Sequence, residues 1–448
     1  MSREHRPLNI GEAPTDPWRV DQPDSCCYIA FVAGEDLPDP GDAFDAILAT
    51  FGVEPEDIEP IGLDDAAVAW SFLCSIKGRA NRVLIWCERA NPAHTPDDEA
   101  RDARWCLVIE TILEFGSPVV DAARLAATVA RMGGQRTLLV FTPDLAMIFR
   151  ANEIERLFLR QPVGALLDER HLFRIEVVGS AGATETTADR THAPQTYWLR
   201  THGLHRVGRP ELEMFEIPHD ELRPALDLLN MLGSRIATEP LPEPGTPFEV
   251  GPQLQITLVP VDEVIETLDP TAAGGARDRG PELRGQRAAV CAVGKRGSFR
   301  AVWMPPHDVL QMVLRGNAGY FVSEGIMRVR ETMARRAWPA FTELFVARAS
   351  YPEARFYAQI EIPAGRADAS GISIAVDDLW IEVTAATNEE VRGVVVTHRS
   401  EGAPRDQGEE MHAPIAALAN WKIISLRIPG REQLVDVTAE EAGILGVS

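Results

Sequence analysis

The chain has 448 residues, 45% of them apolar, and a formal net charge of −23. It is too long for one hydrophobic core, so we expect two or three domains. The acidic charge argues against binding to the phosphates of nucleic acids or to an anionic membrane surface. No apolar run approaches the roughly 20 residues that span a bilayer, and the N-terminus lacks the apolar core of a secretory signal. We therefore expect a cytoplasmic protein.

The first 160 residues alternate predicted strands and helices. The apolar runs 67–76 and 82–88 flank a short loop and predict a β-hairpin. The run 97–115 predicts a helix, because Trp105, Val108 and Ile109 recur at helical spacing. The other predicted elements are strands over 27–33 and 137–141, a helix capped by Asp42, and helices that begin near Asp121 and Thr142. Because a hairpin excludes an all-parallel sheet, this region is predicted to be an α+β sandwich of helices on a mixed sheet.

The next segment predicts four strands and one helix. The strands cover 171–178, 195–201, 211–217 and 253–259, and the helix covers 219–236. A polar stretch over 179–192 predicts a loop. Residues 269–285 are rich in Gly, Ala and charged residues, which is typical of a linker.

The C-terminal part predicts a helix and a small curled antiparallel sheet. Strands are predicted over 288–293, 299–304, 356–362, 379–384, 391–397 and 410–414, and the helix begins at Ser323. Trp380 and Trp421 are predicted to be buried structural anchors, since aromatic side chains on strands usually pack.

These elements predict four parts of the chain. They are a flexible arm (1–25), an N-terminal α+β domain (26–268), a linker (269–285) and a C-terminal α+β domain (286–448). The N-terminal domain is either single or divided into subunits 26–165 and 166–268.

The order of elements after Ser323 carries a resemblance to a known family. The residues concerned are Ala334-Arg335-Arg336, Phe356, Asp378, Trp380, Gly393 and Asn420-Trp421. Over residues 323–428 the chain resembles the YegJ-like bacterial domain of unknown function, which implies a fold with Gly393 as a third structural anchor and no biochemical activity. The chain departs from that family at 397–400, where the family has an Asn and a Pro, and at Asn420, where it has an Asp. The N-terminal part resembles a companion module of similar uncharacterised bacterial proteins.

One polar cluster has residue types that suit chemistry. It contains His202, His205, Glu211 and Glu213 around two glycines. Imidazole and carboxylate groups together can bind Zn²⁺ or Mn²⁺, and a histidine beside a carboxylate can act as a general base. The spacing also fits a plain strand–turn–strand unit, in which the glutamates face solvent or pair with Arg200 or Arg209. Both interpretations remain open from the sequence.

Other motifs give no further site. Residues 294–298 contain Gly and Lys, but predicted strands flank them, so they are predicted to form a hairpin turn rather than a phosphate loop. Neither G-x-S-x-G nor G-x-G-x-x-G occurs. The cysteines include no CxxC pair, which argues against a zinc knuckle. Cys74, Cys87 and Cys106 are predicted to be buried, whereas Cys26-Cys27 fits either packing at a sheet edge or a reactive thiol.

The sequence therefore favours a non-enzymatic binding or interaction protein without a cofactor. The charge of −23 suits electrostatic steering towards a basic protein partner. The alternative is a metal-dependent enzyme with a divalent ion among His202, His205, Glu211 and Glu213. A structural component of a larger assembly is the third hypothesis.

Overall fold

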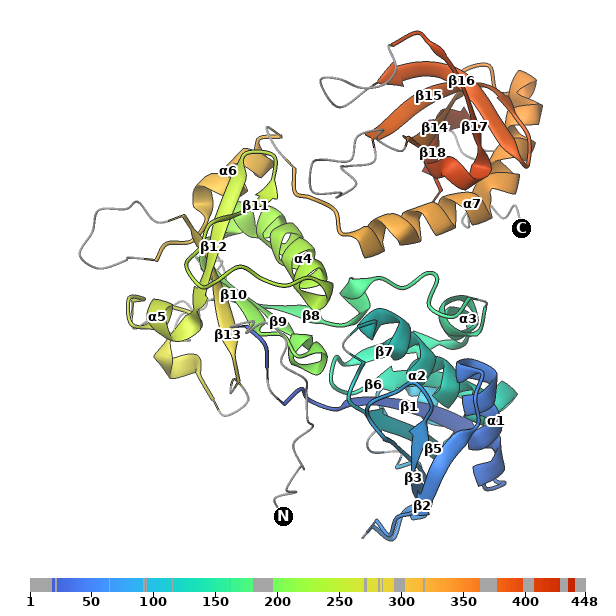
Figure 1. Cartoon of the computed structure of the whole chain (residues 1–448), viewed down its shortest axis with the longest axis vertical. Coiled ribbons are helices and arrows are strands. Elements are labelled where there is room, and N and C mark those ends of the chain that lie inside the picture. Colours follow the sequence, from blue (N-terminus) through green and yellow to red (C-terminus); the bar gives the residue numbers. More distant parts are fainter. Residues whose placement is uncertain are drawn as a thin grey trace, which may run out of the picture. The chain divides into compact units, whose positions relative to one another are not determined.

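The structure is a computed structural model that divides into two compact units, residues 1–323 and 324–448 (Figure 1). Sheets A and B belong to the first unit and sheet C to the second. Together with the helices that cover them, these mainly antiparallel sheets confirm the predicted α+β class. No helix among the described residues is long and apolar enough to cross a membrane. The structure describes residues 18–20, 22–63, 65–91, 93, 95–114, 116–160, 162–179, 196–269, 272–280, 283, 285–293, 303–316, 319–362, 377–397, 407–427 and 434–439.

Sheet A has the strand order β2-β3-β4-β5-β1-β6-β7, with every neighbouring pair antiparallel. Its strands are β1 (Cys26–Ala33), β2 (Pro55–Pro60), β3 (Val68–Ile76), β4 (Val83–Arg89), β5 (Ala103–Thr111), β6 (Thr137–Thr142) and β7 (Met147–Arg150). Helix α2 (Pro118–Gly133) packs on β1, β5 and β6, and α1 (Pro40–Phe51) packs on α2. The short α3 (Ala151–Ile154) continues into a π-helical turn, Glu155–Leu159.

Four predictions for this region are wrong, and the first is the mixed sheet, because every neighbouring pair of strands in sheet A is antiparallel. The predicted helix over 97–115 is instead the interior strand β5, in which Cys106, Leu107, Val108 and Ile109 are all buried. A strand buried on both faces produces a continuous apolar run that periodicity cannot tell from a buried helix. The helix predicted to begin at Thr142 starts only after β7. Helix α1 is capped by Asp39, whose side chain accepts a hydrogen bond from Gly41 N, rather than by Asp42.

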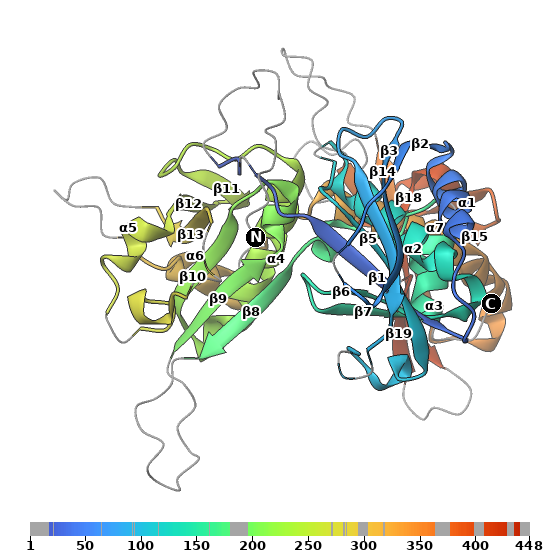
Figure 2. The ribbon, with the colours of Figure 1, turned by 90° about the horizontal axis from the view of Figure 1, so that it is seen from below.

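Sheet B has the strand order β11-β12-β13-β10-β9-β8 and is mixed, because β10 and β13 run parallel. Its strands are β8 (Arg174–Gly179), β9 (Thr196–His202), β10 (Glu211–Pro218), β11 (Phe248–Gly251), β12 (Leu254–Pro260) and β13 (Arg287–Ala292). Helix α4 (Leu222–Thr238) and α5 (Val261–Ile265) lie on opposite faces of this sheet (Figure 2). Helix α6 (His307–Leu314) packs beside α4.

The predicted linker over 269–285 does not separate the two units, which divide between Ser323 and Glu324. Strand β13 follows this segment and pairs with both β10 and β12, so both sides of the segment belong to sheet B. We call its residues 272–280 the strap, because they lie against that sheet. Gly274 contacts Trp198 so closely that a Cβ there would come within 2.5 Å of the indole ring. Composition alone gave no sign of this contact.

The predicted flexible arm is also held where the structure describes it. Trp18 is 1% exposed, and its Nε1 donates a hydrogen bond to Pro242 O at 2.7 Å. Val20 N donates to Gly208 O at 3.0 Å. The segment before β1 therefore packs on the sheet B part of the first unit instead of extending freely.

Sheet C is antiparallel throughout, with the order β17-β16-β15-β14-β18-β19. Its strands are β14 (Arg355–Ile362), β15 (Asp377–Ala386), β16 (Glu390–Thr397), β17 (Glu410–Pro414), β18 (Leu418–Arg427) and β19 (Leu434–Thr438). The long α7 (Glu324–Val346) packs on β18, and Pro339 lies inside this helix. The predicted turn over 294–298, the loop over 180–192 and the departure at 398–400 lie outside the described residues.

Of the three predicted anchors, Trp421 and Gly393 are buried but Trp380 is not a core residue. Leu379 and Ile381 are fully buried, so the alternation of strand side chains puts Trp380 on the other face of sheet C. There its half-buried ring lies 4.6 Å from Lys422 Nζ. The predicted role of Trp380 as a buried anchor is therefore wrong.

We expect Gly393→Ala to destabilise the second unit by about 1–3 kcal/mol. A Cβ at this position would come within 2.4 Å of Glu382 O, a backbone atom of the neighbouring strand that cannot rotate away. Urea unfolding of the full chain, followed by hydrogen exchange of peptides from sheet C, would measure the loss. Gly62→Ala, which adds a Cβ with nothing within 4 Å, is the control. Equal stability of the two variants would contradict the prediction.

Candidate functional site

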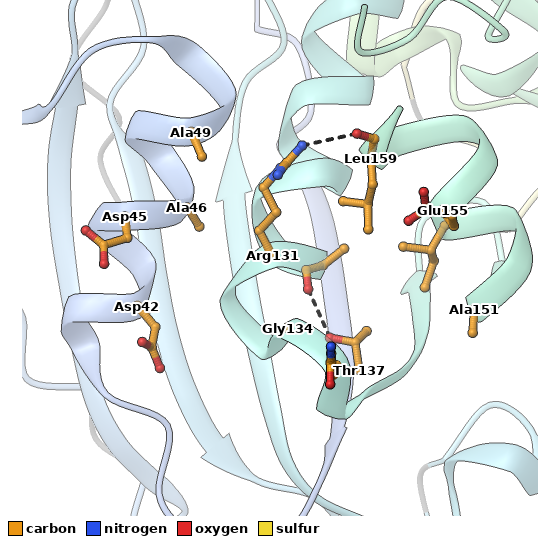
Figure 3. A pocket seen from close by; sticks show the side chains of 13 residues that line it. Asp42, Asp45, Ala46, Ala49, Arg131, Gly134, Thr137, Ala151, Glu155 and Leu159 are labelled. Atoms are coloured by element: carbon orange, nitrogen blue, oxygen red, sulfur yellow. Dashed lines mark hydrogen bonds between the residues drawn. The ribbon is translucent and has the colours of Figure 1, made fainter. Parts of the chain in front are cut away.

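A cleft of about 580 Å³ opens on the helical face of sheet A (Figure 3). Helix α1 supplies one wall and the segment from Ala151 to Leu159 the other, with α2 between them. Its apolar surface comes from small and branched side chains, namely Ala46, Ala49, Ala130, Ile154 and Leu159. Small side chains let another backbone approach closely. We call this feature the acidic cleft, for the charges described next.

Three carboxylates and one guanidinium line the acidic cleft. Asp42 and Asp45 come from α1, Glu155 from the π-helical turn and Arg131 from α2. Arg131 Nη2 donates to Leu159 O at 3.3 Å, so its charge is directed at a backbone carbonyl (Figure 3). Glu155 has an arginine, Arg160, at 3.9 Å. The cleft therefore keeps an excess of negative charge.

The two aspartates of α1 lack a counterion within the part of the chain that the structure describes. Asp42 lies in the first turn, where a carboxylate interacts favourably with the helix dipole. Asp45 lies three residues later on the same face, and like charges at this spacing repel by a few tenths of a kcal/mol. A cation bound in the cleft would relieve this repulsion.

The polar cluster at 202–213 is organised differently from the predicted site. Glu211 is 3% exposed and accepts hydrogen bonds from Thr201 Oγ1 and Gly203 N, both at 2.7 Å. His205 Nε2 lies 2.9 Å from Gln286 O, whereas His202 is exposed. The carboxylate of Glu211 therefore fixes the turn between β9 and β10. The prediction that the glutamates face solvent or pair with Arg200 or Arg209 is wrong for Glu211, and it is also wrong for Glu213, which is buried.

Glu213 is completely buried between two arginines. Arg279 of the strap forms a bidentate ion pair with its carboxylate, at 2.5 and 3.1 Å, and Arg287 of β13 contacts it through Nε. Trp198 Nε1 also donates to Glu213, at 2.8 Å. Both oxygens of Glu213 are therefore occupied by donors from the protein itself.

The four predicted metal ligands are thus not brought together. Glu211 and Glu213 bind protein donors, and His202 lies in solvent. Among the residues that the structure describes, no group of three or more His, Cys, Asp or Glu side chains is placed to hold a metal ion. No geometric observation here favours the metal-dependent alternative.

The cysteines are free thiols, and Cys26 lies in the interior strand β1 rather than at a sheet edge. Burial raises the pKa of Cys26, although the Arg206 guanidinium beside it acts in the opposite direction. Burial likewise raises the pKa of Cys74 to about 11 and that of Cys106 to about 12. Because the thiolate is the reactive form, these thiols are poor nucleophiles at neutral pH.

Sequence reasoning identified Glu213 but missed its partners, and it missed the acidic cleft. Arg279 belongs to no recognisable motif, and it lies 66 residues after Glu213 in the sequence, so the sequence does not indicate that the two residues pair. For the cleft, one signal was present: Asp42 and Asp45 share a face of a helix whose other face is apolar. Their position opposite Glu155 depends on how α3 packs, and helical periodicity does not report that.

Comparison with known proteins gives one match. Residues 184–291 match the family model described as "Protein of unknown function (DUF4026) C-terminal". The described part of this segment runs from β9 to β13 and includes the strap, so the match agrees with a continuous sheet B on both sides of it. The match does not extend to residues 323–428, so it does not test the predicted likeness to the YegJ-like domain. No curated protein and no solved structure matches the chain.

Proposed function

We propose that this protein is a non-enzymatic, cytoplasmic binding protein whose acidic cleft takes up a basic segment of a protein partner. One observation carries the proposal: three carboxylates surround an apolar surface of small side chains in a cleft of about 580 Å³. Lysine and arginine suit such a site, because their aliphatic stems cover apolar surface while their charged ends reach the rim. The second unit, for which we retain the resemblance to the YegJ-like domain, contributes no chemistry to this proposal.

The overall charge supports the same choice of partner. A net charge of −23 speeds the encounter with a basic protein and disfavours nucleic acids and anionic membranes. The exposed carboxylates of the cleft act at close range, where a cation also removes the repulsion between Asp42 and Asp45. Affinity should therefore fall as salt screens these charges.

We expect the double variant Asp45→Lys, Glu155→Lys to bind a basic partner about tenfold more weakly, since each exposed ion pair contributes about 0.5–1 kcal/mol. Partners would be isolated from lysate at low salt, and their affinities for purified variants would be measured at two salt concentrations. An oligolysine peptide would serve as a defined probe.

The matched control is Glu243→Lys, Glu266→Lys, which changes the net charge equally through exposed residues outside the cleft. If both double variants weaken binding equally, only long-range charge matters and the cleft is not the site. If no salt-sensitive partner binds the wild-type protein, the proposed function is wrong.

A further inference from the structure

An aromatic and acidic cage lies on sheet B, on the face opposite α4. It consists of Trp198 from β9 with Glu213 and Phe215 from β10, and all three are at most 4% exposed. The two rings are nearly parallel, at 6°, with their centroids 6.5 Å apart. Arg287 of β13 holds the carboxylate from one side. All four residues come from strands, so the sheet alone builds the cage.

The cage is filled by the guanidinium group of Arg279. Its two Nη atoms reach the two oxygens of Glu213, and its Cζ lies 5.6 Å from the Trp198 ring and 5.7 Å from the Phe215 ring. A planar guanidinium matches a carboxylate through two parallel hydrogen bonds, and aromatic rings attract cations. The contacts therefore select guanidinium over ammonium.

The strap that carries Arg279 has few other anchors. Residues 272–280 read Ala-Ala-Gly-Gly-Ala-Arg-Asp-Arg-Gly and contain no large apolar side chain. Within the strap, Gly274 N donates to Asp278 Oδ2 and Arg279 Nε donates to Gly274 O. Gly274 also lies on the Trp198 ring with φ +81°. Among the described residues of the strap, Ala273, Gly274 and Gly275 are buried, and Arg279 is the side chain that forms an ion pair with the sheet.

We propose that the cage is a binding site for the arginine side chain of another protein, occupied in cis by Arg279. When an arginine-bearing peptide enters, the strap moves away and the incoming guanidinium takes over both hydrogen bonds to Glu213. The charges then remain balanced as before, since one guanidinium replaces another beside Arg287. This site is separate from the acidic cleft and does not depend on the proposed function.

Removing the internal ligand tests the proposal. Arg279→Ala is expected to bind ethylguanidinium saturably, with a dissociation constant on the order of millimolar, as suits a very small ligand. Ethylammonium should bind about tenfold more weakly, because it cannot form the bidentate pair. Calorimetry would measure both, with Arg223→Ala, which removes an arginine whose side chain is 85% exposed, as the matched control. Equal binding of both probes by Arg279→Ala, or no binding, would overturn the cage as a guanidinium site.

A second measurement uses the wild-type chain and does not depend on how well the variant folds. An arginine-containing peptide should accelerate hydrogen exchange in residues 272–280, whereas its lysine analogue should not. The tethered Arg279 competes at an effective concentration on the order of millimolar, so the peptide must be titrated well above that level. Unchanged exchange in the strap at such concentrations would refute displacement. Because Asp45→Lys, Glu155→Lys leaves the cage intact, it should respond like the wild-type chain, and this separates the cage from the cleft.

Discussion

Trp421→Ala is expected to lower the free energy of unfolding of the second unit by about 3–5 kcal/mol. The indole is completely buried, and its Nε1 donates to Ala334 O in α7 at 3.1 Å. Its ring lies 5.2 Å from that of Phe341, which also contacts Phe356 edge-on at 5.6 Å. Truncation would leave a cavity where helix and sheet meet. Urea unfolding of the full chain, with hydrogen exchange read from peptides of β15, β16 and β18, would measure the effect.

Trp380→Ala provides the matched control within the same sheet. This ring is half-buried on the opposite face, and Lys422 Nζ lies 4.6 Å from its centroid. An exposed cation–π pair contributes about 0.5–1 kcal/mol, so the loss should be several-fold smaller. A loss below about 1 kcal/mol for Trp421→Ala would mean that the ring is not the core anchor that the structure shows.

The contrast between the two tryptophans shows what the sequence can predict. Both were assigned to the curled sheet correctly, and Trp380 lies in the strand predicted over 379–384. The sequence also contains the information that Trp380 lies on the less buried face of sheet C. The apolar residues 379, 381 and 383 alternate with it along the strand, and their side chains occupy the buried face. The prediction that Trp380 is buried used only the tendency of aromatic side chains on strands to pack, and it ignored this alternation.

Strand β5 and the strap are two elements that the local sequence predicts wrongly. In β5, Trp105, Val108 and Ile109 satisfy a helical period only because almost every residue of that interior strand is buried. The opposite error occurred at 272–280, where composition indicated a linker but Arg279 ties the chain to Glu213. One long-range ion pair can order a Gly-rich segment, and local composition contains no information about it.

In the candidate site, too, the sequence predicts the local features but not those that depend on long-range packing. The helical face that carries Asp42 and Asp45 is local, so periodicity predicts it. The cleft itself arises only when α1, α2 and the turn after α3 pack together, which brings residues 42 and 155 to one opening. For the predicted cluster at 202–213, the residue types were informative but their partners were not local. Glu213 binds two arginines that follow it by 66 and 74 residues.

Glu213→Gln is expected to destabilise the first unit by about 3–5 kcal/mol, because it leaves buried guanidinium groups without their carboxylate. The side chains of Arg279 and Arg287 are only 16% and 7% exposed, so water cannot solvate them fully in place of Glu213. The amide keeps the shape of the side chain, and the loss therefore reports charge rather than a cavity. Urea unfolding of the full chain, read by hydrogen exchange in peptides of β9, β10 and β13, would measure it.

Two further variants separate uncompensated charge from a general intolerance of sheet B to substitution. Glu249→Gln removes an exposed carboxylate from β11 and should change stability by at most about 0.5 kcal/mol. Adding Arg279→Met and Arg287→Met to Glu213→Leu removes every charge of the buried group. It should recover much of the stability, since apolar replacement of a buried ion triad is often neutral or favourable. If this triple variant is no more stable than Glu213→Gln, the hydrogen bonds of the triad rather than its charge balance hold β10 to β13 and the strap.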